Sequence, residues 1–173
     1  GGKAAGGGRA RPQRPSAFRT QPDPEKWTAA DYVDIDKGEH GDYITGLVPA
    51  GDRLLIFKTN SVHAIFGFDS DSFQVVTLSS DVGSIALSSP VSTTYGTFFW
   101  YADQGVYLYN GERFIWVFDK LSPAIDDGRL DNIDTNPPQL AWGNNKLYVS
   151  VDWTESGATT RRTLIYDPTI GEG

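Results

Sequence analysis

The sequence predicts an all-β protein made of about three blades of a β-propeller. The main observation is an internal repeat. Residues 51–67 form an apolar strand, a tight turn and a second apolar strand closed by glycine, and residues 96–111 repeat this pattern. A third copy spans residues 143–167, and the opening glycines lie about 45 residues apart, the spacing of a four-stranded blade. Aromatic residues make up 13% of the chain, and 19 glycines and 10 prolines supply the frequent turns of an all-β protein.

In the first expected blade, short turns separate four apolar runs. Ala50–Asp52 predicts a hairpin turn, and Asp69–Ser72 predicts an outer turn in which short polar side chains bond their own backbone. The apolar runs are nearly continuous, which suits strands that pack on both faces. The expected strands are 43–49, 54–58, 62–66 and 73–78.

The second blade contains the strongest hairpin signal, Asn110-Gly111, because both central residues of a type I′ turn need positive φ. The third blade lacks a fourth strand, and a long hairpin loop is expected from Asp152 to Thr160. Three blades cannot close a ring, which takes at least four, so further blades or other chains must cover the open faces. The expected strands are 91–95, 97–102, 105–109 and 114–118, then 139–142, 146–151 and 160–166, so that the blades occupy 43–79, 91–119 and 139–173 of a propeller region 27–173.

Residues 1–26 predict a basic arm or linker, disordered or extended, because this glycine-, arginine- and proline-rich stretch has little to bury. The net charge is −7, but the first 20 residues hold five positive charges and no acid, so the rest carries about −12. A basic arm on an acidic body is typical of docking on an acidic surface or nucleic acid, although a simply solvated tail gives the same pattern. The candidate contact residues are Lys3, Arg9, Arg11, Arg14 and Arg19.

Length and composition exclude several classes of protein. The 173 residues suffice for one domain with a core, and no run of about 20 apolar residues predicts a membrane-spanning segment. Without cysteine there is neither a disulfide scaffold nor a thiolate metal site. The chain also lacks methionine, so we expect it to be part of a longer protein.

No pattern of residues predicts a catalytic, metal or cofactor site. His63 alternates within a strand and is expected to be a structural histidine, while His40 in a glycine loop lacks further fixed ligands. Asp69 and Asp71 are spaced like part of a calcium loop, but the glycine and glutamate of such a loop are missing. The acids Asp34, Asp36, Asp126 and Asp127 favour no catalytic pair by spacing alone.

The aromatic residues are expected to pack mainly between blades. Trp153, beside the expected loop, is the candidate for stacking on a sugar or contacting a partner chain. Arg161 and Arg162 lie on the same hairpin, and strand alternation turns one of them outward.

The order of motifs resembles the β-propeller module of tailed-bacteriophage structural proteins, namely tail nozzle (tail tubular) and minor tail proteins. The resemblance covers residues 27–130 and is carried by the sequences GDRLLIFK at 51–58, SVHAIFG at 61–67, SDVGS at 80–84, GTFFW at 96–100 and DQGVYLYNG at 103–111. It implies a non-enzymatic virion component in the phage tail, without catalytic residues or cofactors. It further implies a homo-oligomeric ring, contacts with other tail or connector proteins, and possible contact with genomic DNA in the channel.

Two other functions fit the same fold, because propellers host many unrelated activities. The first alternative is a carbohydrate- or host-receptor-binding propeller that uses loop aromatics. The second is a propeller-fold hydrolase or lyase, which would draw on the acids named above.

Overall fold

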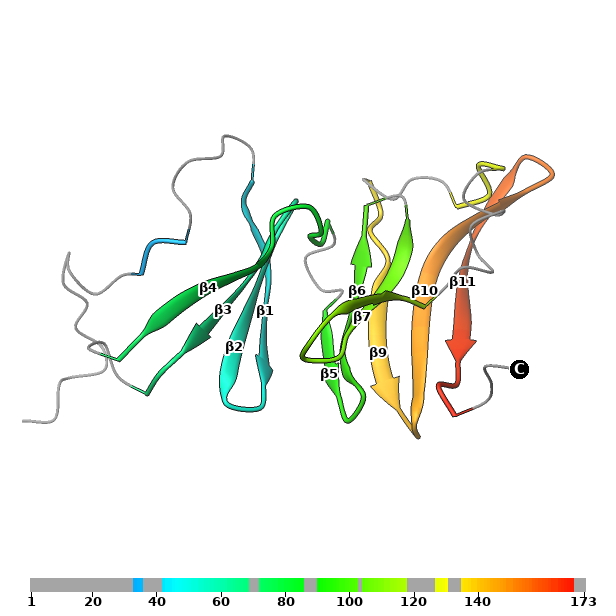
Figure 1. The fold of residues 1–173 in the computed structure, drawn as a ribbon. Coiled ribbons are helices and arrows are strands. Elements are labelled where there is room, and N and C mark those ends of the chain that lie inside the picture. The colour runs from blue at the N-terminus through cyan, green and yellow to red at the C-terminus, as the bar shows by residue number, and fades with distance from the viewer. Residues whose placement is uncertain are drawn as a thin grey trace, which may run out of the picture. The chain divides into compact units, whose positions relative to one another are not determined.

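The computed structural model describes residues 33–35, 42–68, 72–85, 90–102, 104–117, 127–130 and 135–169. The chain divides into residues 1–33 and 34–173, and the strands of the described residues lie in the second unit (Figure 1). The described residues form eleven β-strands and no helix, so the all-β prediction is confirmed. Over this described part, no helix is long and apolar enough to cross a membrane.

The first sheet contains four antiparallel strands in sequence order, each joined to the next by a short connection. It pairs Leu55 of the second strand with Val48 of the first and Ala64 of the third. Near the sheet's end the register shifts after Val62, where the fourth strand carries one extra residue, Leu78. The strands are β1 (Ile44–Ala50), β2 (Arg53–Lys58), β3 (Val62–Phe66) and β4 (Gln74–Ser79), which confirms the four predicted strands to within a residue or two.

The second sheet repeats this antiparallel order, and the third has three strands. Gly96 opens the longest strand of the second sheet at φ 129°, and a Cβ there would collide with the carbonyl oxygen of Tyr109, so only glycine fits. The strands are β5 (Val91–Thr93), β6 (Gly96–Tyr101), β7 (Gly105–Tyr109) and β8 (Phe114–Trp116), then β9 (Gln139–Gly143), β10 (Lys146–Glu155) and β11 (Ala158–Tyr166).

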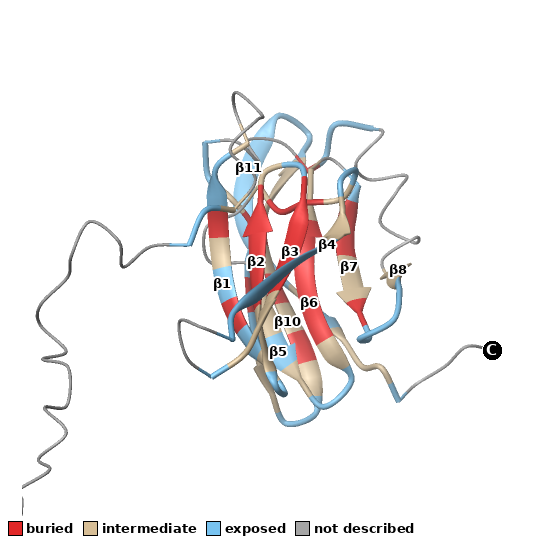
Figure 2. Ribbon diagram, turned by 60° about the vertical axis from the view of Figure 1, so that its left-hand side comes forward, coloured by how far each residue is buried: buried red, intermediate tan, exposed pale blue. Residues whose placement is uncertain are grey.

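The second sheet is packed on both faces, because successive side chains of a strand point to opposite sides. Phe99 packs with the first sheet, in a buried cluster with Leu55, Phe57, Val62 and Ala64. Phe98 and Trp100 pack on the other side with the third sheet, where the buried partners are Leu140, Leu147, Val149 and Val151. Figure 2 shows this burial concentrated in the middle strands β2, β3 and β6. The sequence GTFFW therefore belongs to two cores at once.

The first strands of the three sheets also lie next to one another. β1 contacts β5, and β5 contacts β9. Each sheet thus has an inner edge, formed by β1, β5 or β9, that faces the corresponding edge of the next sheet. The outer edges are β4, β8 and β11.

The long loop predicted between Asp152 and Thr160 is not observed. β10 continues to Glu155 and β11 begins at Ala158, so a two-residue turn joins the two strands. Its residues Ser156 and Gly157 both have positive φ, 53° and 80°, as a tight hairpin turn requires. The prediction failed because a serine at positive φ is a weak signal in the sequence. The type I′ turn predicted at Asn110-Gly111 is also wrong, because Gly111 has positive φ (99°) but Asn110 does not, and residues 110–113 connect β7 to β8.

Candidate functional site

A chain of polar contacts runs through the end of the first sheet, within an otherwise apolar region. Lys58 Nζ lies 3.4 Å from Asp42 Oδ2, and the two side chains are only 3% and 6% exposed. The hydroxyl of Ser61 donates to the same carboxylate oxygen at 2.7 Å and lies 2.9 Å from Nε2 of His63. Nδ1 of His63 is 3.1 Å from the hydroxyl of Thr77. We call Asp42, Lys58, Ser61, His63 and Thr77 the polar chain.

Asp42 is held as a carboxylate by its surroundings. Burial acts to raise its pKa, but the hydrogen bond from Ser61, the backbone N–H of Asn60 at 2.8 Å and the charge of Lys58 outweigh it. The pKa of Asp42 is therefore lower than that of an ordinary aspartate. Because two donors and a cation converge on this carboxylate, it fixes the segment that precedes β1 against the β2–β3 turn.

Ser61 and His63 do not form a nucleophile and base. Ser61 gives its single proton to Asp42, so its oxygen accepts from Nε2–H of His63, the reverse of the transfer that activates a serine. Ser61 is 4% exposed and His63 is 1% exposed, which leaves no access for a substrate. The polar chain is therefore a structural element, as the sequence predicts for His63.

The motif SDVGS fastens the connection after β4 onto the end of β2. Gly83 lies so close to Lys58 and Thr59 that a Cβ would collide with both carbonyl oxygens, and the next backbone N–H, of Ser84, donates to Lys58 O at 2.8 Å. Tyr101 of the second sheet donates its hydroxyl to Asp81 O at 2.6 Å. This motif therefore joins the first two sheets.

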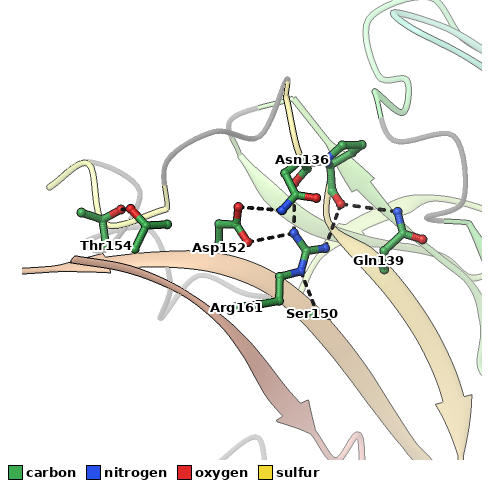
Figure 3. A network of polar contacts seen from close by, with 8 residues as sticks. Asn136, Gln139, Ser150, Asp152, Thr154 and Arg161 are labelled. Atoms are coloured by element: carbon green, nitrogen blue, oxygen red, sulfur yellow. Dashed lines mark hydrogen bonds and ion pairs between the residues drawn. The ribbon is translucent and has the colours of Figure 1, made fainter. Parts of the chain in front are cut away.

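Arg161, a predicted contact residue, is occupied in a second polar network (Figure 3). Its guanidinium donates to Asp152 Oδ1 at 3.0 Å and to the carbonyl oxygens of Asn136 and Pro137 at 3.1 and 3.0 Å, and its Nε donates to Ser150. Asn136 donates to the other oxygen of Asp152 at 2.7 Å. The hydrogen bonds from Asn136 and Arg161 lower the pKa of Asp152. Arg161 thus ties β11 to the segment that enters β9.

Arg162 and Trp153 lie on the opposite face of the same hairpin. The guanidinium of Arg162 lies over the indole of Trp153 at 5.5 Å from the ring centroid, and it pairs with Glu155 at 2.8 Å. Trp153 packs against the core between the second and third sheets, and its buried Nε1 has no hydrogen-bond partner among the described residues. A sugar could stack on this face of the ring only if Arg162 moved aside.

A cavity of about 280 Å³ lies between the turns at one end of the first two sheets. Tyr95 is 36% exposed at this cavity, which is open to solvent and has both polar and apolar walls. The sequence does not indicate this cavity, because its walls come from three different turns. The lining residues are Ala50 to Arg53, Ser92 to Thr97 and Tyr109 to Gly111.

Several other predicted residues fall outside the described ranges. They are the arm residues Lys3, Arg9, Arg11, Arg14 and Arg19, and also Asp36, His40, Asp69, Asp71 and Asp126. Asp127 lies 3.7 Å from Arg129 in an exposed ion pair. Within the described ranges, no three histidine or acidic side chains are grouped as metal ligands.

The comparisons with known proteins give no family. No protein-family model matches this sequence, and no curated protein matches it either. The functional conclusion therefore follows from the geometry together with the sequence motifs.

Proposed function

We propose that this chain is a segment of a β-propeller and serves as a non-catalytic structural component of a tailed-bacteriophage tail, of the nozzle or minor tail type. The main support for a propeller comes from the second sheet. The first and third sheets pack on its two faces, and its inner strand β5 contacts their inner strands β1 and β9. Consecutive sheets arranged in this way are the repeating unit of a propeller.

Further support comes from the residues that carry the resemblance, since they are the ones that hold neighbouring sheets together. Phe98, Phe99 and Trp100 fill both cores, and Gly83 brings the SDVGS motif against β2. The buried polar residues Ser61 and His63 of the first sheet bond within the polar chain. A module whose characteristic residues serve packing suits a building block of an assembly better than an enzyme.

The assignment to a virion is tested on particles. An antibody raised against the whole chain is applied to tailed virus particles purified from the source of this sequence, and immunogold electron microscopy locates the label. We expect gold at the tail and peptides of this chain in the mass spectrum of the particles. Peptides confined to the particle-free fraction would overturn the virion role without affecting the fold.

The cavity between the turns favours carbohydrate binding as a second candidate function. Tyr95 offers a ring of the kind that packs against sugar C–H groups, and Asp52 and Asn110 at the same cavity can bond to hydroxyls. Trp153, the residue first expected to do this, is covered by Arg162.

This second function predicts that the chain binds members of a glycan array and that Tyr95→Ala abolishes the binding. Trp153→Phe, which leaves the cavity untouched, is expected to bind as the parent chain does. A silent array, or signals that survive Tyr95→Ala, would remove this candidate.

A further inference from the structure

The outer edges of the three sheets differ in how they are protected against pairing with other strands. An edge strand presents unpaired backbone N–H and C=O groups, and proteins shield such edges with charges, prolines or short strands. β8 has only three residues, and β11 carries Arg161 and Arg162. β4 has six residues, QVVTLS, with neither a charge nor a proline. Among the outer edges of the described strands, β4 is therefore the one that has no charge and no proline and is not short, and its one irregularity is the bulge at Leu78.

The side chains of β4 are open to solvent on both faces of the first sheet. Val75 lies opposite Ile65 on one face and is 38% exposed, and Val76 lies opposite Ala64 on the other and is 44% exposed. Phe73, just before the strand, is 44% exposed. A strand added at this edge would cover apolar side chains on both faces and also satisfy the backbone groups.

We propose that β4 pairs with β4 of a second copy of this chain, so that two first sheets form one continuous antiparallel sheet. A two-fold axis perpendicular to the sheet keeps both faces continuous and sets Val75 or Val76 opposite its own symmetry mate. Paired β-branched residues stabilise adjacent strands, and an uncharged strand meets its copy without repulsion. A charged partner strand would gain no ion pair at this edge, which favours the second copy as occupant.

The bulge limits the extent of the contact. The register with β3 is regular from Gln74 to Thr77 and shifts at Leu78, so about four residues per copy are available for the new ladder. Such a contact is well below the roughly 800 Å² per partner of a standard interface. The dimer is therefore weak and forms in the micromolar range or above. It differs from a head-to-tail ring and does not depend on the virion role.

Sedimentation velocity of the 173-residue chain over a range of concentrations tests the proposal, with hydrogen exchange measured at the same concentrations. We expect a monomer–dimer equilibrium, and amide protection that rises with concentration in β4. Val76→Lys and Val76→Glu should each raise the dissociation constant at least tenfold, because each sets like charges close together across the axis. An equimolar mixture of the two variants should regain dimerisation, since the introduced ammonium and carboxylate groups then face each other.

Ile165→Lys is the matched control, because Ile165 is also an exposed strand residue, on the outer edge that carries the arginines. It should dimerise as the parent chain does, and circular dichroism should confirm that all three variants fold. A monomer at every concentration, a dimer that both Val76 variants retain, or unchanged exchange in β4 would each overturn the proposal. Immunogold labelling of the tail is unaffected by any of these outcomes, so the two proposals fail separately.

Discussion

Replacing Asp42 with alanine is expected to lower the free energy of unfolding by about 3 kcal/mol, the low end of the range for breaking a buried ion pair. The change removes the carboxylate that lies 3.4 Å from Lys58 and accepts hydrogen bonds from Ser61 and Asn60. Lys58, at 3% exposure, cannot turn to water without leaving its place beside the core. Urea denaturation followed by tryptophan fluorescence measures the loss.

Two further variants separate the charge from the shape of this side chain. Asp42→Asn keeps an oxygen for Ser61 but loses the negative charge, so a smaller loss than with alanine is expected. Asp42→Ala combined with Lys58→Met removes both charges, and buried pairs replaced by apolar residues are often nearly neutral. The double variant should therefore be more stable than Asp42→Ala alone. Equal stability of Asp42→Ala and the parent chain would show that the ion pair contributes nothing.

The same residue gives stability a defined dependence on pH. The pKa of Asp42 is lower in the folded chain than in the unfolded chain, so the unfolded state binds the proton more readily. The contribution of Asp42 to the free energy of unfolding is complete above pH 3.8, the ordinary pKa of an aspartate. It is lost as the pH falls through the lower pKa of the folded state. In Asp42→Asn, the free energy of unfolding should therefore fall less steeply at acid pH than in the parent chain, because the contribution of Asp42 is missing. Asp152 acts in the same direction through Asn136 and Arg161.

The strands were predictable from sequence because the repeat combines two local signals. Glycine turns mark where several strands begin, and near-continuous apolar runs such as LLIF and TFFW mark strands covered on both faces. The structure has the expected eleven strands in the described residues, with ends shifted by a few residues at most sites. One exception is the turn at Asn110-Gly111, where Asn110 lacks the positive φ of a type I′ turn. Another is the β10–β11 hairpin, where the mostly polar residues on either side of Ser156 predict a loop. Thr154 and Thr159 instead pair across the strands, with their hydroxyl oxygens 2.8 Å apart.

The polar chain was not predictable, because its members come from three separate segments. Asp42 precedes β1, Lys58 ends β2, and Thr77 lies on β4. Only one signal pointed to it: a lysine that closes an apolar run, IFK, where a buried neighbour with a negative charge is needed. The contacts of Arg161 could not be predicted for a similar reason, since its backbone acceptors, Asn136 and Pro137, are 24 or 25 residues away in sequence.

Phe99→Ala and Phe98→Ala are each expected to cost about 3–5 kcal/mol of unfolding free energy, the usual range for a buried phenylalanine. Both side chains are fully buried, yet they belong to different interfaces because they alternate along β6. Phe99 lies 4.9 Å from Phe57 of the first sheet, ring centroid to ring centroid. Phe98 lies 5.9 Å from Trp142 of the third sheet. Calorimetry or urea denaturation gives the total loss for each variant.

Hydrogen exchange then shows where each variant opens, and this decides whether the sheets behave as separable blades. If the second sheet holds its neighbours through independent cores, Phe99→Ala should speed exchange mainly in β2 and β3, and Phe98→Ala mainly in β9 and β10. Ile165→Ala, at a 60% exposed position, is the control and should change little in either region. If both variants instead loosen all three sheets equally, the unit folds as one core, because a cavity on either side of β6 is then felt throughout. That result would remove the physical basis for reading the sheets as repeating blades, whereas separate opening is what a sheet packed on both faces predicts.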